Sequence, residues 1–328
     1  MMKSRVLNYI VSSAIYKEII HLLKKIKFKR YEGLTLYEVI KVFIEKITKD
    51  EIIERANGVA FNFTLSIFPA IIFLFTLTPY IHAIIPEVSK ESILVFLGEL
   101  LPASMYDTIY TTVEDIVSRT RGGLLTFGAV FSLWLATNGM MSLMKAFNAV
   151  YKTTEKRSFI KTRLVGTGLT IMLAVSMMLA SILLVIGNIV VNFINEIQWL
   201  DIQSYQVYIF FIVRFLVLFL VFFLAISFIY YFGPAVHYNW RFFSIGSFVA
   251  TGLCMLVTYG FSFYVSNFAT YNKLYGSLGI LIALMIWQEI LSIVLLVGYE
   301  INASIHQAYR LSGLEDVLPG IRTKSIKN

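Results

Sequence analysis

Residues 207–232 read VYIFFIVRFLVLFLVFFLAISFIYYF, and this stretch decides the class of fold. Its one charged residue is Arg214. As a helix rising 1.5 Å per residue, the stretch is about 39 Å long, more than the roughly 30 Å of hydrocarbon in a bilayer. Lipid offers no hydrogen bonds to a backbone, so an apolar stretch in a bilayer is helical. The sequence therefore predicts a transmembrane helix here.

Five further stretches have the same character. With the first, they predict an all-α integral membrane protein with six transmembrane helices. Hydrophobic residues make up 58% of the chain and charged residues 15%, in agreement with this class. The five run over Gly58–Ile81, Gly123–Met144, Leu164–Ile194, Phe242–Val265 and Tyr275–Ala303.

Lysine and arginine residues fall into alternate connecting segments. The first 57 residues contain 12 of them, residues 145–163 contain six, and four follow Ala303. The opposite side holds only Lys90, Arg119, Arg121 and Lys273. Because basic loops stay in the cytoplasm, this pattern predicts that both termini are cytoplasmic. Anionic lipids at that surface account for the net charge of +8, so no nucleic-acid partner is expected.

The predicted membrane domain covers residues 57–305. Residues 1–56 form a basic amphipathic segment before it, and residues 306–328 form a cytoplasmic tail. Within the first segment, apolar residues recur at helical spacing after Thr35, which is placed to cap a helix: Leu36, Val39, Ile40, Phe43 and Ile47. This helix lies on the cytoplasmic membrane surface or binds a partner.

Residues 82–121 form the longest segment between predicted spans. Their apolar residues predict an extracytoplasmic amphipathic helix, which either covers the bundle as a lid or packs at the membrane surface.

Two charges lie inside predicted spans, Arg214 and Glu289. A charge in hydrocarbon is costly, so we expect both to face protein or water. Glu289 is predicted to face the bundle interior. The two residues form an ion pair that holds two helices together, or Arg214 extends outward to the membrane surface, or both line a polar pathway.

Polar residues four positions apart share a side of a helix in two places, Asn62 with Ser66 and Gln288 with Ser292. These pairs either line a cavity or stabilise helix contacts. At the cytoplasmic end, Lys145, Arg241 and Glu300 are predicted to form a charged cluster, as a structural clamp or as a contact for a substrate headgroup.

Four sequence segments resemble the YihY/BrkB family, over residues 55–305. They are AFNFTLSIFP at 60–69, SLW at 132–134 with residues through Phe159, YFGP at 231–234, and YGSLG at 275–279 followed by Trp287 and LVGYEINA at 296–303. The second segment includes Asn138, Gly139, Asn148, Tyr151, Glu155 and Arg157. Glu289 departs from the family pattern.

The resemblance implies a six-helix protein of the bacterial inner membrane. The family was once labelled ribonuclease BN and is linked to virulence and serum resistance, and transport of lipids or other envelope components has been suggested for its members.

The sequence itself favours no enzyme and no cofactor. Its four histidines are dispersed, and no metal-ligand spacing or phosphate-binding glycine loop occurs. Three functions remain: transport or handling of a lipid or small-molecule substrate, a non-transporting envelope scaffold, and, least favoured, a membrane-bound ribonuclease.

Overall fold

The computed structural model describes residues 14–28, 31, 33–49, 51–82, 122–151, 153–196, 204–235, 241–267 and 277–312. Within these ranges the chain forms eight α-helices and one isolated bridge between Lys27 and Thr35. The helices are α2 (Ala14–Lys25), α3 (Leu36–Lys49), α4 (Ile52–His82), α7 (Gly122–Val150), α8 (Phe159–Glu196), α9 (Ser204–Phe232), α10 (Ile245–Asn267) and α12 (Ser277–Leu311).

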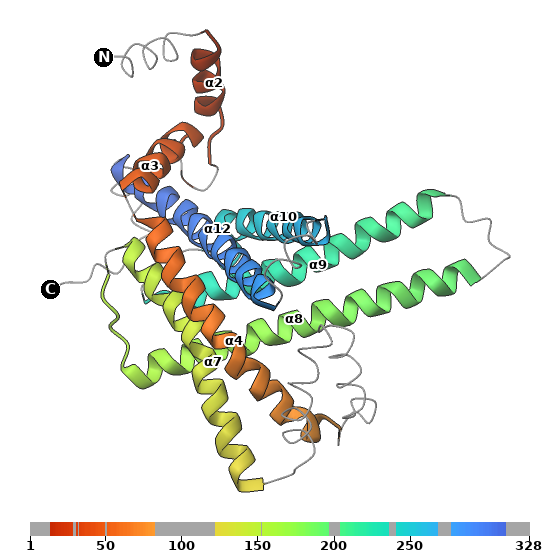
Figure 1. Ribbon diagram of the computed structural model, residues 1–328. Helices are drawn as coiled ribbons and strands as arrows, with labels where there is room; N and C mark the ends of the chain where they lie inside the picture. Colours follow the sequence, from red (N-terminus) through yellow and green to blue (C-terminus); the bar gives the residue numbers. More distant parts are fainter. Residues whose placement is uncertain are drawn as a thin grey trace.

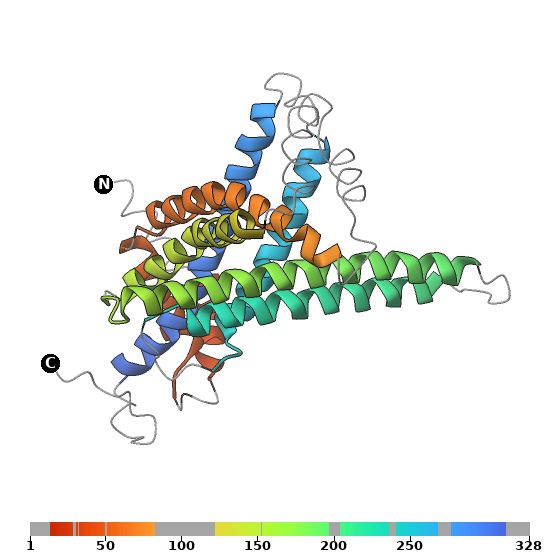
Figure 2. The same cartoon turned by 90° about the horizontal axis from the view of Figure 1, so that it is seen from below.

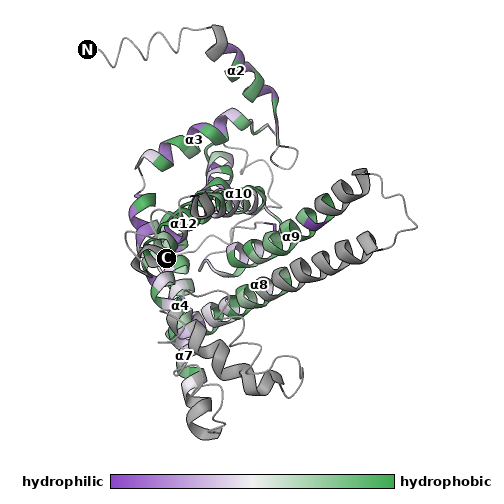
Figure 3. Ribbon diagram, turned by 45° about the vertical axis from the view of Figure 1, so that its right-hand side comes forward, coloured by the Kyte–Doolittle hydropathy of each residue, from purple (hydrophilic) through white to green (hydrophobic). Residues whose placement is uncertain are grey.

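Each of the six predicted stretches falls largely on a helix, from α4 to α12. Four of these helices are confirmed as long and apolar enough to cross a bilayer, over Phe159–Met177, Ile212–Phe232, Ile245–Tyr264 and Ile282–Leu311. For α4 and α7 the helix is confirmed, and the crossing stays a prediction. Figure 3 shows the contrast with α2 and α3, where hydrophilic and hydrophobic residues alternate, while the described part of α9 is almost entirely hydrophobic.

The long helices form three antiparallel pairs, α4 with α7, α8 with α9 and α10 with α12. The pairs converge at the end that holds the start of α4 and the ends of α7 and α9, and they diverge away from it (Figures 1 and 2). The described core lies at this convergent end. There the Phe147 ring stacks on Tyr299 at a centroid distance of 4.2 Å and meets the edge of Tyr230 at 5.5 Å.

Glycine allows α10 and α12 to touch through their backbones. A Cβ atom at Gly298 would lie 2.6 Å from the Cβ of Ala250, and one at Gly246 would collide with the Gly298 carbonyl oxygen. The Gly246 N–H donates to Oδ1 of Asn302 at 2.8 Å. Gly298 and Asn302, both in the last of the family-like segments, therefore take part in the same contact between α10 and α12.

The α3 helix is capped as the sequence predicts. The Thr35 N–H donates to a Glu38 carboxylate oxygen at 2.8 Å, and the Glu38 N–H donates to the Thr35 hydroxyl at 3.4 Å, which is a capping box. Val39 packs in a cluster with Ile305 and Tyr309 of α12. One part of the amphipathic face is therefore covered by the chain itself, whereas Ile44 remains exposed.

The predicted domain boundaries at 56/57 and 305/306 fall within α4 and α12, because these helices begin at Ile52 and end at Leu311. The predicted helical segment at 82–121 lies outside the described residues except for His82, which ends α4, and residues 1–13 and 313–328 also lie outside them.

Candidate functional site

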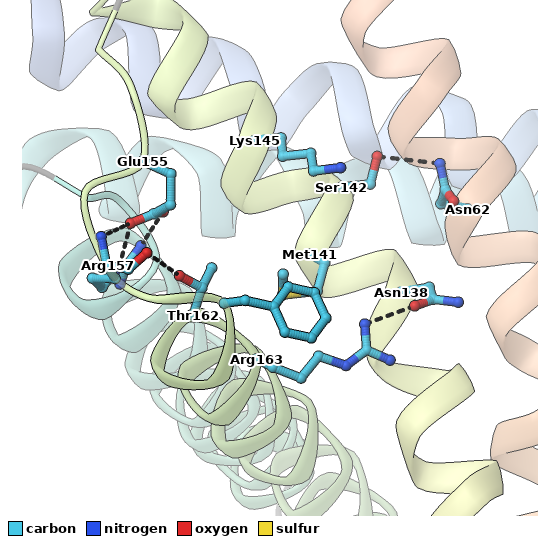
Figure 4. Close-up of a pocket in the computed structure, with 10 residues that line it drawn as sticks. Asn62, Asn138, Met141, Ser142, Lys145, Glu155, Arg157, Thr162 and Arg163 are labelled. Atoms are coloured by element: carbon cyan, nitrogen blue, oxygen red, sulfur yellow. Dashed lines mark hydrogen bonds and ion pairs between the residues drawn. The ribbon is translucent and has the colours of Figure 1, made fainter.

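A pocket with a volume of about 500 Å³ lies between α4, α7, the turn after α7 and the start of α8 (Figure 4). Three of its lining residues are cationic and one is acidic, so the lining carries a net charge of +2. The full lining is Asn62, Asn138, Met141, Ser142, Lys145, Glu155, Arg157, Phe159, Thr162 and Arg163.

Arg163 of α8 is 7% exposed and is fixed against α7. Its Nη1 donates to Asn138 Oδ1 at 2.8 Å, its Nη2 donates to the Trp134 carbonyl oxygen, and its guanidinium lies 4.0 Å from the centre of the Trp134 ring. Its Nε has no hydrogen-bond partner among the residues that the structure describes. A buried donor without a partner costs free energy, and none of the described partners of Arg163 carries a negative charge.

Lys145 supplies the second cation from α7. Its side chain is exposed, and it forms no ion pair with any described residue. Beside it, Asn62 Nδ2 of α4 donates to the Ser142 hydroxyl at 3.3 Å (Figure 4). One wall of the pocket is therefore a contact between α4 and α7, and the ammonium group of Lys145, which has no described ion-pair partner, lies next to it.

Arg157, the third cation, donates hydrogen bonds from all three of its side-chain nitrogens. Its Nε and Nη2 each donate to the Glu155 carboxylate at 2.8 Å. The other bonds go to the end of α9, from Nη1 to the Phe232 carbonyl at 3.2 Å and from Nη2 to the Gly233 carbonyl at 2.8 Å. Arg157 thus joins the turn after α7 to the C-terminus of α9.

Asn148 completes this junction. It donates from Nδ2 to Glu155 at 3.0 Å and accepts the Ala235 N–H at its Oδ1 at 2.8 Å. Glu155 lies outside the membrane-spanning segments. The hydrogen bond from Arg157 is the main cause that lowers the pKa of its carboxyl group, against the smaller opposing effect of burial.

A second charged cluster lies where α3 crosses α12. Lys46 Nζ is 2.7 Å from Oε1 of Glu300, whose side chain is fully buried. The same ammonium group lies 5.5 Å from the centre of the Tyr151 ring. The structure thus shows Lys46 as a partner of Glu300. Of the other two members of the predicted cluster, Lys145 lines the pocket and Arg241 is exposed.

The predicted pair of Asn62 and Ser66 lies where α4 meets α7. The Ser66 hydroxyl accepts the Gly139 N–H at 2.9 Å and donates to the Asn62 carbonyl at 2.6 Å. A Cβ at Gly139 would lie 2.7 Å from the Phe63 ring, so the helices are in close contact here. Ser66 takes part in a helix contact, and Asn62 takes part in both that contact and the pocket.

Glu289 is half-buried on α12. With the Asn57 amide turned so that its nitrogen donates, that nitrogen lies 3.1 Å from Glu289 Oε1 and 3.0 Å from the Ile53 carbonyl. The Ser292 hydroxyl, which is buried, donates to the Gln288 carbonyl at 2.7 Å. Arg214 is half-buried on α9, and its pairing with Glu289 stays a prediction.

Sequence reasoning did not single out Arg163, Asn138 or Lys46 as site residues. Asn138, Glu155 and Arg157 belong to the family-like segments, which is the signal that pointed to this region. Arg163 was counted only as one of several cytoplasmic charges. Among the described residues, no group of three or more His, Cys, Asp or Glu side chains is placed to hold a metal ion.

The paired apolar helices define the class of the molecule, a multi-pass helical membrane protein. The chain belongs to the virulence factor BrkB family, whose model matches residues 43–316. The resemblance seen in the sequence is therefore confirmed.

Two kinds of named relatives are similar to this chain. YfkH of Bacillus subtilis (strain 168), described as ribonuclease-like, is 32% identical over 272 residues, which is 83% of this chain and 96% of that protein. A UPF0761 membrane protein of Alteromonas mediterranea is 24% identical over 276 residues, covering 84% of this chain and 90% of that protein. One from Paraburkholderia xenovorans is 24% identical over 287 residues, covering 84% and 62%. No solved structure matches the chain.

Proposed function

We propose that the protein transports or handles a lipid or another anionic component of the cell envelope. It does so in the cytoplasmic membrane of a bacterium, with both termini in the cytoplasm. The observation that carries the proposal is the polar pocket with a net charge of +2, built among long apolar helices. A cationic, partly desolvated site next to hydrocarbon fits a ligand that has an anionic head and an apolar body.

The predicted orientation supports the same function. It places residues 145–163, which supply most of the pocket lining, at the cytoplasmic surface. Lipid headgroups lie at that depth, so a lipid would meet the pocket from the side of the membrane.

Reconstituted transport tests the proposal. The purified full-length protein is placed in liposomes with a trace of fluorescent phosphatidylglycerol or phosphatidylcholine, and a membrane-impermeant quencher is added outside. We expect the protein to expose the inner-leaflet fluorescent phosphatidylglycerol faster than in protein-free liposomes. An inner-leaflet fraction that stays protected with both lipids contradicts transport of lipids.

The same purified protein also tests the two other candidate functions, an envelope scaffold and a ribonuclease. If the protein moves no lipid but retains a protein partner from its own membrane through detergent extraction, the scaffold function holds instead. We propose that the chain is not an enzyme. The name of the Bacillus subtilis relative makes RNA cleavage the activity to test, and cleavage that a single acidic or histidine substitution abolishes in a folded protein would contradict that proposal.

A further inference from the structure

We propose that the pocket binds the phosphate group of an anionic phospholipid, with the Lys145 ammonium and the Arg163 guanidinium as the cations that hold it. This inference deepens the proposed function, since it names the headgroup and the residues for the same site. It rests on how the three cations of the pocket are paired.

The pairing leaves two cations available. Each of the three Arg157 nitrogens already donates to Glu155 or to one of the two carbonyls at the end of α9, so only one of its five N–H groups is left for a ligand. Glu155 in turn is neutralised by Arg157. Lys145 forms no ion pair with a described residue, and the Nε of Arg163 has no hydrogen-bond partner among the described residues.

Contacts within the protein hold the Arg163 side chain in place in the absence of a ligand. Its side chain is more than nine-tenths buried, and Asn138 and Trp134 hold two of its three nitrogens. Neither of these partners is a carboxylate, so the positive charge of Arg163 is not neutralised by them. A phosphate group would supply the missing negative charge, because charge-assisted N–H bonds from a guanidinium to phosphate are short and strong.

The surroundings of the pocket favour a lipid as the source of the phosphate. Phe159 lines the pocket and is 68% exposed, and Leu164 on the same helix is 66% exposed. Trp134 is 44% exposed and contacts Phe159 at a centroid distance of 6.1 Å. These apolar side chains lie next to the buried cation. A soluble phosphate compound would leave this apolar surface uncovered. The acyl chain of a lipid bound by its headgroup would cover it, and burial of apolar surface is favourable.

The test is lipid-dependent thermal stabilisation of the purified full-length protein in detergent micelles. Phosphatidylglycerol, phosphatidylcholine and glycerol 1-phosphate are titrated separately, because a ligand that binds only the folded state raises the unfolding temperature. We expect phosphatidylglycerol to stabilise the protein saturably and the other two to do so only at much higher concentration.

Three variants locate the binding. Lys145→Gln removes an exposed charge without disturbing a described contact, and we expect it to raise the half-saturating lipid concentration about tenfold to a hundredfold, the loss of one charge-assisted bond. Arg163→Lys keeps the charge but loses the guanidinium geometry, and we expect a similar shift. Lys161→Gln is the matched control, because Lys161 is exposed on the same helix and does not line the pocket.

Three results overturn the inference. Equal weakening by Lys145→Gln and Lys161→Gln means that the lipid responds to general surface charge. Equal stabilisation by phosphatidylcholine means that the pocket does not select a net anionic head, and tight binding of glycerol 1-phosphate means that the site takes a soluble phosphate. Binding that behaves as expected in a protein that moves no lipid in liposomes contradicts the proposed transport and leaves the phosphate site in place.

Discussion

The charged cluster at Lys46 and Glu300 and the charged pocket at Lys145 and Arg163 use the same kinds of side chain for different ends. In the first, a fully buried carboxylate meets its ammonium partner at 2.7 Å. In the second, Lys145 has no ion-pair partner and the Nε of Arg163 no acceptor among the residues that the structure describes. A charge that is paired inside the protein stabilises the fold, whereas a charge that is held in place without neutralisation is available to a ligand. In this bundle, whether a charged side chain has a partner of opposite charge therefore separates structural charges from those available for binding.

Breaking the Lys46 and Glu300 pair should give the largest loss of stability. Lys46→Met leaves a buried carboxylate without this partner, at a cost of about 3–5 kcal/mol, while Glu300→Gln removes the buried charge itself and should cost less. The double variant should recover part of the loss of Lys46→Met. Thermal unfolding of the four proteins in detergent measures the cycle. Additive effects of the two substitutions would show that the ion pair does not couple α3 to α12.

The comparison also shows what the sequence can predict. Apolar length and charge alternation predicted the helices α4 and α7 to α12, and the spacing after Thr35 predicted the cap of α3. The partner of Glu300 was not predictable in the same way. Helical periodicity places Lys46 on the polar side of α3, but it carries no information on where α3 crosses α12, and that crossing decides the pair.

Only some of the residues that line the pocket could be predicted from the sequence, for a similar reason. Asn62 and Lys145 were candidates because of their residue types and positions along single helices. The role of Arg163 depends on the approach of α8 to Trp134 and Asn138 of α7, which is a tertiary contact. Arg157 and Glu155 are close in sequence, but the carbonyl groups that fix Arg157 lie at Phe232 and Gly233, far along the chain.

A smaller effect is expected at the junction of the turn after α7 with α9. Arg157→Ala removes the donor of the Phe232 and Gly233 carbonyls and leaves Glu155 with only the hydrogen bond from Asn148, and we expect a loss of about 2–3 kcal/mol. Lys156→Ala, at the exposed neighbouring position, is the matched control and should change stability by less than about 0.5 kcal/mol. Equal unfolding temperatures for the two variants would show that the Arg157 hydrogen bonds do not stabilise the fold.

The smallest effect is the acid dependence of the same junction. The hydrogen bonds from Arg157 hold the pKa of Glu155 below its value in the unfolded chain, so the unfolded state binds the proton more readily. The resulting stabilisation is complete above the unfolded pKa and is lost as the pH falls through the folded one. Because the ion pair is partly exposed, we expect less than about 1 kcal/mol from it. Unfolding temperatures measured from neutral pH into this acid range should fall more steeply for the wild type than for Glu155→Gln, which carries no titrating group there. Parallel curves would mean that the charge of Glu155 contributes nothing to the fold, and Arg157 would then have to be reconsidered as a cation that an anionic ligand can recruit.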